Sequence, residues 1–291
     1  MSKKTLFTGA GTALITPFTE DGVNYEALGE IIEFQIENSV DALIICGTTG
    51  EAATMPDREH LGVIEYAVKK TAGRVPVIAG TGSNDTAHTI ALSKAAESLG
   101  MDGLLVVSPY YNKPTSSGLV AHYEAVAKAV STPIILYNVP GRTGVDIPVS
   151  VYRELSQIPN IAGVKEASAD ITKITKIIAS CDNDLPIWTG NDELITPAMS
   201  LGAKGVISVI SNLLPAETKT LADAALSGNF TEAAAIQMEL QPVVEVLFSE
   251  SNPIPVKEAM RLIGYDCGSC RLPLTPISLE NRKKLEHLIK N

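Results

Sequence analysis

Residues 103–137, GLLVVSPYYNKPTSSGLVAHYEAVAKAVSTPIILY, decide the fold class of this chain. The two ends of this stretch, residues 103–107 and 133–137, are short and almost entirely apolar. Such runs are typical of strands that are buried on both faces of a parallel sheet. Between them, residues 119–130 space their apolar side chains as an amphipathic helix does. The stretch therefore predicts one strand–helix–strand unit.

The same strand pattern occurs eight times along the chain. The runs cover residues 11–17, 42–46, 75–79, 103–107, 133–137, 161–165, 186–189 and 205–208. Helical patterns lie between the strands, for example over residues 25–37, 58–71, 86–99, 119–130 and 171–179. Eight strands, each followed by a helix, close a (β/α)8 barrel, so we predict an α/β TIM barrel over residues 1–225.

The strand pattern ends near residue 225, and the remaining residues, 226–291, predict a C-terminal helical region. Its helices are expected over residues 231–247, 256–262 and 279–289. Asn252 and Pro253 have the residue types of a helix cap and a first helical position, so we expect a helix to begin there.

An open, doubly wound sheet also alternates strands and helices. That architecture usually carries a glycine-rich dinucleotide-binding turn after an early strand. The candidate turn here, Gly80-Thr81-Gly82, lacks a third glycine and lacks an acidic residue about 20 positions later. The barrel is therefore favoured.

Composition excludes several classes of protein. Asp and Glu number 33 against 23 Lys and Arg, a net charge of -10, so we expect no nucleic-acid partner. No apolar run approaches the roughly 18 residues of a membrane span, and no signal-peptide core follows Lys3 and Lys4. We therefore expect a cytoplasmic protein without membrane contact.

Cys267 and Cys270 have the spacing of half a zinc site or of a redox motif. The other half of such a site is missing, which favours a structural role for the two cysteines.

Lys165 is the strongest catalytic candidate, because catalytic groups of a barrel lie at the C-terminal ends of its strands. It ends an otherwise apolar run, and burial in the barrel mouth would lower its pKa and make its amine a nucleophile for a carbonyl. A salt-bridged lysine would have the same spacing. Tyr137 ends the preceding strand, where its phenol could transfer protons or its ring could simply cap the core.

Three more polar residues lie at predicted strand ends. Thr48 and Thr49 stand between glycines, where free hydroxyls and N–H groups can bind a carboxylate or relay a proton, unless the turn is purely structural. Arg142 lies in a loop and could hold a carboxylate with two hydrogen bonds, although it could also be a surface residue. The histidines have no metal-ligand spacing, which disfavours a metal site: they are His60, His88, His122 and His287.

Five segments in this order resemble the dihydrodipicolinate synthase family. They are Gly47-Thr-Thr-Gly-Glu51, Pro109-Tyr-Tyr111, Tyr137-Asn-Val-Pro-Gly-Arg-Thr-Gly144, Val164-Lys-Glu-Ala167 and Asn252-Pro-Ile-Pro255. The resemblance runs from about residue 9 to residue 276. It implies a (β/α)8 barrel with a C-terminal helical region and a class I aldolase-type lyase. The implied reaction condenses pyruvate with L-aspartate 4-semialdehyde to 4-hydroxy-tetrahydrodipicolinate without a cofactor, at the first committed step of diaminopimelate and lysine biosynthesis.

The resemblance also implies the roles of individual residues. Lys165 matches the Schiff-base lysine, Tyr137 the proton-relay tyrosine and Thr48 its hydrogen-bonding partner. Tyr111 matches a third relay member that is donated across a dimer interface, which implies a homo-oligomer, and we expect a tetramer built from tight dimers. The implied substrate-binding residues are Thr49 for the pyruvate carboxylate, Arg142 for the semialdehyde carboxylate, and Gly190 and Ile207 in the pyruvate pocket.

Two alternatives remain at this stage. Pyruvate-dependent aldolases of the N-acetylneuraminate lyase or 2-keto-3-deoxy sugar acid type share the lysine and the tyrosine. They typically have Ser-Thr in place of Thr48-Thr49 and lack an arginine at the position of Arg142, which favours the synthase. A barrel that only binds is disfavoured, because every relay position carries the residue that the chemistry needs.

The resemblance further predicts weak inhibition by lysine. Inhibited members bind lysine in an interface pocket, and the matching positions are Ala52, Ala53, Asp57, His60, Asn84, His88 and Tyr110. His88 replaces the glutamate that pairs with a lysine amine, Asp57 replaces a histidine and Ala52 replaces a serine. An unpaired buried ammonium costs on the order of 3 kcal/mol, which would remove most of the affinity.

Overall fold

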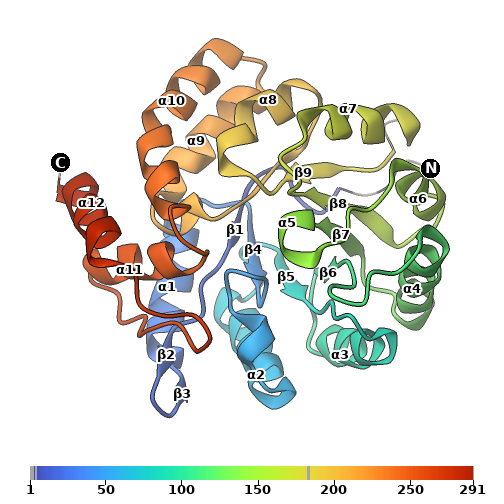
Figure 1. Ribbon diagram of the computed structural model, residues 1–291, viewed down its shortest axis with the longest axis horizontal. Helices are drawn as coiled ribbons and strands as arrows, with labels where there is room; N and C mark the ends of the chain where they lie inside the picture. Colours follow the sequence, from blue (N-terminus) through green and yellow to red (C-terminus); the bar gives the residue numbers. More distant parts are fainter. Residues whose placement is uncertain (1–2, 4, 182–183, 291) are drawn as a thin grey trace.

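Eight parallel strands close into a barrel in the order β1-β10-β9-β8-β7-β6-β5-β4, which confirms the predicted fold class (Figure 1). The structure, a computed structural model, describes residues 3, 5–181 and 184–290. The strands are β1 (Gly9–Ala13), β4 (Ala42–Ile45), β5 (Val77–Gly80), β6 (Gly103–Val107), β7 (Ile134–Asn138), β8 (Ile161–Glu166), β9 (Ile187–Thr189) and β10 (Gly205–Ser208).

The first strand lies earlier than residues 11–17, where the sequence predicted it. After Ala13 the chain leaves the sheet, because the side chain of Asn212 accepts the Ile15 N–H at 3.1 Å. The chain then forms an unpredicted hairpin of β2 (Phe18–Thr19) and β3 (Gly22–Val23).

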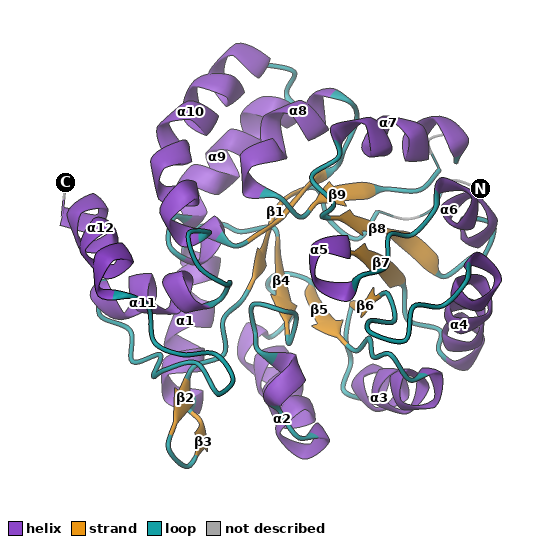
Figure 2. Cartoon of the chain, in the orientation of Figure 1, coloured by secondary structure: helices purple, strands orange, loops and turns teal. Residues whose placement is uncertain are grey.

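Helices surround the barrel, as Figure 2 shows. They are α1 (Tyr25–Glu37), α2 (Asp57–Thr71), α3 (Thr86–Ser98), α4 (Ser116–Ala129), α6 (Val149–Leu155), α7 (Ile171–Ser180), α8 (Ile195–Ser200) and α9 (Pro215–Leu226). Short elements between them are η1 (Ala52–Thr54), α5 (Pro140–Thr143), η2 (Asp192–Leu194) and η3 (Ile210–Asn212). Helix α4 begins before residue 119 because the Thr115 hydroxyl caps it by accepting the Gly118 N–H.

Three C-terminal helices follow, close to their predicted positions: α10 (Phe230–Leu247), α11 (Ile254–Leu262) and α12 (Leu279–Lys290). Helix α9 ends at Leu226, and the division of the chain at residue 225 stays a prediction. The expected cap at Asn252 is wrong. Helix α11 begins after Pro253 without a side-chain cap: the Asn252 Oδ1 accepts no hydrogen bond from the described residues, and its amide donates to the Thr49 hydroxyl.

The barrel interior is apolar at one end and polar at the other. Phe7 stacks on Trp188 with ring centroids 4.9 Å apart, and Trp188 is completely buried. A Cβ at Gly163 would lie 2.5 Å from the Trp188 ring, so the glycine makes space for the indole. Tyr137 belongs to the same interior cluster and lies near the C-terminal end of β7. The C-terminal strand ends are therefore where the polar groups of this barrel gather.

Candidate active site

Lys165 and Tyr137 form the centre of the candidate site. They are register partners on β8 and β7, so their side chains point to the same side of the sheet. Both are largely buried, with 5% and 6% of their surface exposed. The Lys165 Nζ lies 4.5 Å from the centroid of the Tyr137 ring. An amine and a phenol in this arrangement can act on the same small carbonyl compound.

Gly190 lies beside Lys165, and Ile207 belongs to the same interior cluster as Tyr137. A Cβ at Gly190 would stand 2.8 Å from the Lys165 Cε and 2.7 Å from the Ala167 Cβ, so only a glycine leaves the lysine its space. Ile207, on β10, is fully buried in the interior cluster that contains Tyr137. One residue thus shapes the space around the lysine stem, and the other supplies apolar surface.

Thr48 and Thr49 lie in a tight turn after β4, residues 48–51, which we call the 48–51 turn. The Glu51 N–H donates to the Thr48 carbonyl at 3.1 Å and closes the turn. Thr49 is buried, and its hydroxyl accepts a hydrogen bond of 2.9 Å from the Asn252 amide. Thr48 is partly exposed. Among the described residues, its hydroxyl makes no hydrogen bond with Tyr137, so the predicted pairing of these two side chains stays a prediction.

Asn252 is a site residue that the sequence reasoning did not assign. Its carbonyl accepts a 3.0 Å hydrogen bond from Arg142 Nη2, and its amide holds Thr49. Its Oδ1 is buried and has no hydrogen-bond partner among the described residues. The signal was present in Asn252-Pro-Ile-Pro255, but the residue types there suggested a helix cap. Arg142 itself is exposed on α5, where a guanidinium can reach an arriving substrate.

Tyr111 does not join the other site residues within one chain. Its side chain is 89% exposed, and its backbone φ of 72° is rare for a residue other than glycine. The Tyr111 N–H donates to the Thr143 carbonyl at 3.3 Å, which ties its loop to α5. The ring therefore projects from the surface near the site entrance.

Glu166 fixes the strand ends behind the lysine, another role that the sequence reasoning did not assign. Its buried carboxylate accepts hydrogen bonds from the Asn138 amide at 2.9 Å, the Ser168 N–H at 2.9 Å and the Tyr152 hydroxyl at 3.2 Å. Burial, and next the Glu166 charge, raise the pKa of Tyr152 well above its usual value, so that phenol stays a donor. Glu166 thereby joins the ends of β7 and β8, where Tyr137 and Lys165 lie.

Comparison with known proteins gives the family of the chain. The chain matches the model of the Dihydrodipicolinate synthetase family over residues 6–291. It belongs to this family. It is 50% identical to the 4-hydroxy-tetrahydrodipicolinate synthase of Acetivibrio thermocellus, over 99% of this chain and 98% of that one.

Solved structures of the family share the fold closely. The dihydrodipicolinate synthase of Aquifex aeolicus is 48% identical, with a TM-score of 0.96 over 98% of this chain and 97% of that one. A structure described as the first monomeric dihydrodipicolinate synthase variant is 39% identical, also with a TM-score of 0.96, over 98% and 96%. The chain is thus an enzyme of the lyase class, and these relatives support the synthase over the aldolase alternative.

Three of the positions that the resemblance matches to a lysine pocket already have hydrogen-bond partners within the chain. His88 Nε2 lies 3.0 Å from Asp57 Oδ1. His60 Nε2 lies 2.8 Å from the Gly80 carbonyl, and burial lowers its pKa. A ligand's ammonium group would therefore have to share the Asp57 carboxylate with His88.

The two cysteines of the Cys267-Gly-Ser-Cys270 segment lie in the interior or partly so. Cys267 is buried and Cys270 partly so, and burial raises the pKa of each thiol to about 12. Both are therefore protonated at neutral pH, as expected for structural cysteines.

In the part of the chain that the structure describes, no group of three or more His, Cys, Asp or Glu side chains could hold a metal ion. No described helix is long and apolar enough to span a bilayer.

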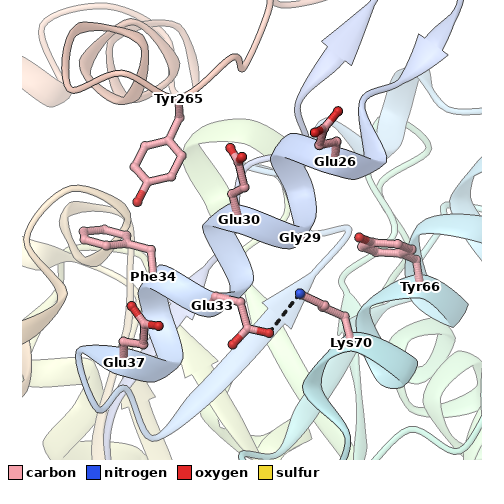
Figure 3. Close-up of a pocket in the computed structure, with 9 residues that line it drawn as sticks. All are labelled: Glu26, Gly29, Glu30, Glu33, Phe34, Glu37, Tyr66, Lys70 and Tyr265. Carbon is pink, nitrogen blue, oxygen red and sulfur yellow. Dashed lines mark ion pairs between the residues drawn. The ribbon is translucent and has the colours of Figure 1, made fainter.

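A cavity of about 580 Å³ lies along α1 (Figure 3) and contains none of the predicted site residues. Glutamates line it, and Glu33 pairs with Lys70 at 3.0 Å. Its carboxylates would repel an acidic substrate, so we place the active site at the barrel mouth instead. The lining residues are Glu26, Gly29, Glu30, Glu33, Phe34, Glu37, Tyr66, Lys70 and Tyr265.

Proposed function

We propose that this chain condenses pyruvate with L-aspartate 4-semialdehyde to 4-hydroxy-tetrahydrodipicolinate through an imine on Lys165. The observation that carries the proposal is the buried lysine beside Tyr137 at the barrel mouth, in a chain that belongs to the Dihydrodipicolinate synthetase family. The covalent step needs only this amine, so no cofactor is part of the proposal.

The chemistry begins when the Lys165 Nζ attacks the ketone carbon of pyruvate. The carbinolamine loses water and becomes an imine, and Tyr137 supplies and removes the protons. Loss of a methyl proton then gives an enamine, whose carbon attacks the aldehyde of the second substrate. The amino group of that substrate finally attacks the imine carbon, closes the ring and releases Lys165.

The remaining residues bind and orient the two substrates. The Thr49 hydroxyl and the N–H groups of the 48–51 turn suit the pyruvate carboxylate, and Thr48 links the turn to the proton relay. Arg142, exposed at the entrance, suits the carboxylate of the semialdehyde. Gly190 and Ile207 line the pyruvate pocket in this proposal, and the space that Gly190 leaves beside the Lys165 stem supports it.

We also propose that the active form is at least a dimer. Tyr111 is a large aromatic residue that is 89% exposed in the single chain, as expected if it enters the site of a neighbour. A tetramer of such dimers in the cytoplasm completes the proposal.

Borohydride trapping tests the imine. Incubation with pyruvate and sodium borohydride should add one reduced pyruvyl group to Lys165 alone, and the Lys165→Ala variant should gain no such mass. Lys257 is an internal control, because it is also buried but is held in an ion pair. A modified peptide other than that of Lys165, or no adduct on a folded protein, would refute the assignment.

A further inference from the structure

The 48–51 turn adopts a conformation that its own sequence does not favour. Glu51 has a φ of 55°, in the left-handed region, which costs a residue with a Cβ roughly 1–2 kcal/mol. Such a conformation persists only where the surroundings determine it. Since Thr48 and Thr49 belong to this turn, whatever holds Glu51 also sets the positions of their hydroxyl and N–H groups.

A buried ion pair holds Glu51. Its Oε1 lies 2.7 Å from Lys257 Nζ, and its Oε2 accepts the Arg271 N–H at 2.9 Å. The side chains of Glu51 and Lys257 are each only 2% exposed. The ammonium also donates to the Ser269 carbonyl at 3.2 Å and lies 4.4 Å from the centroid of the Phe18 ring. Both carboxylate oxygens and the ammonium are thus fully engaged.

A buried ion pair such as that of Glu51 and Lys257 is a poor source of folding stability. Removing two ions from water costs several kcal/mol for each, and apolar residues of similar volume often stabilise a fold as well or better. What the pair provides is direction, because a carboxylate with two fixed donors permits one orientation of the residue that bears it.

The same C-terminal segment reaches the turn at a second point. Asn252, just before α11, holds the Thr49 hydroxyl and accepts from Arg142, whereas Lys257, within α11, holds Glu51. Residues in α11 and just before it therefore hold the 48–51 turn at the side chains of both Thr49 and Glu51. Arg142 is connected to the same segment.

We infer that Lys257 and Glu51 are a positioning pair, which holds the 48–51 turn so that Thr48 and Thr49 can bind the pyruvate carboxylate. The inference rests on the proposed function. Neither side chain touches the reacting atoms, and Lys257 is not a second imine-forming lysine, because its ammonium is already bonded to Glu51 and Ser269.

Three variants separate positioning from stability. Lys257→Met leaves the Glu51 carboxylate buried without its ion partner. Glu51→Gln likewise leaves the Lys257 ammonium buried without a partner charge. Each single variant should therefore unfold more easily than wild type. The double variant removes both charges and should regain most of the lost stability. In the double variant no ion pair holds the 48–51 turn. The pyruvate concentration that gives half-maximal borohydride trapping should therefore rise by about tenfold or more. The rate of trapping at saturating pyruvate should change much less.

A distant ion pair provides the matched control. Arg74 and Glu33 pair at 2.7 Å on the surface. The double variant Glu33→Gln, Arg74→Met should leave the pyruvate dependence of trapping unchanged. If the Lys257 and Glu51 double variant regains both its stability and the wild-type pyruvate dependence, the pair is only structural and the inference is wrong. If wild type itself traps no pyruvate at Lys165, the proposed function fails instead.

Discussion

Gly190→Ala should separate the space around Lys165 from the chemistry of its amine. The new Cβ would lie 2.8 Å from the Lys165 Cε and 2.7 Å from the Ala167 Cβ, against about 3.5–4.0 Å for carbon atoms in ordinary contact. The backbone at Gly190 is not in the left-handed region, so alanine adds no backbone strain there. The only perturbation is therefore one methyl group placed against the lysine stem.

The lysine has to move by roughly the size of this overlap, about 1 Å, because Ala167 is fixed to the backbone while the lysine stem can turn. Overpacking of this kind costs about 1–3 kcal/mol of folding stability. A displacement of about 1 Å at a reacting group can cost about 100-fold in rate. We therefore expect kcat/KM to fall by about 100-fold in a protein that remains folded.

The assay compares steady-state turnover, the rate of borohydride trapping and urea unfolding of the variant with those of wild type. Gly141→Ala is the control, because a Cβ at Gly141 meets nothing within 4 Å and its φ is not positive. The control should trap pyruvate at the wild-type rate. A Gly190→Ala enzyme with wild-type trapping and turnover would refute the reasoning that Gly190 gives the lysine its space.

Four further changes have definite expectations. Arg142→Ala should raise the KM for the semialdehyde far more than that for pyruvate, because each charge-assisted bond contributes about 1.5–3 kcal/mol; equal changes would argue against its role. Tyr111→Asp should lower turnover in step with loss of dimer in sedimentation, and a fully active monomer would contradict the shared site. Lysine should not reach half-inhibition below about 1 mM, or about -4 kcal/mol of binding, because His88 already pairs with Asp57; stronger inhibition in a coupled assay would disprove this. Burial, the largest cause, lowers the pKa of His122 from 6.5 to about 4, so the unfolded chain binds this proton first as the pH falls. The free energy of unfolding should therefore fall by up to about 3 kcal/mol as the pH is lowered from 6.5 to 4. In urea unfolding, the His122→Gln variant should lack this part of the decline.

Two buried lysines show how much can be predicted from residue types alone. Lys165 could be named as a candidate because it ends an apolar run at a predicted strand end, although a salt-bridged lysine would have the same spacing. Lys257 has no such signal, because it lies in a stretch that predicts a helix, yet it is among the most buried lysines of the described chain and holds the 48–51 turn. Its burial depends on Phe18 and Glu51, which are remote in the sequence and could not be paired with it from spacing.

The sequence by itself determined the fold class and most of the barrel strands and the helices around them. Continuous apolar runs mark strands that are buried on both faces, and 3.6-residue spacing marks the helices around them, because both patterns are local. The tertiary structure decided which strand ends meet and what holds them. Asn252 binds Thr49 across 203 positions, and Lys257 binds Glu51 across 206. Closure of the barrel and docking of α11 create these contacts, and no local pattern encodes them. They are the contacts that hold the 48–51 turn, which we propose binds the pyruvate carboxylate.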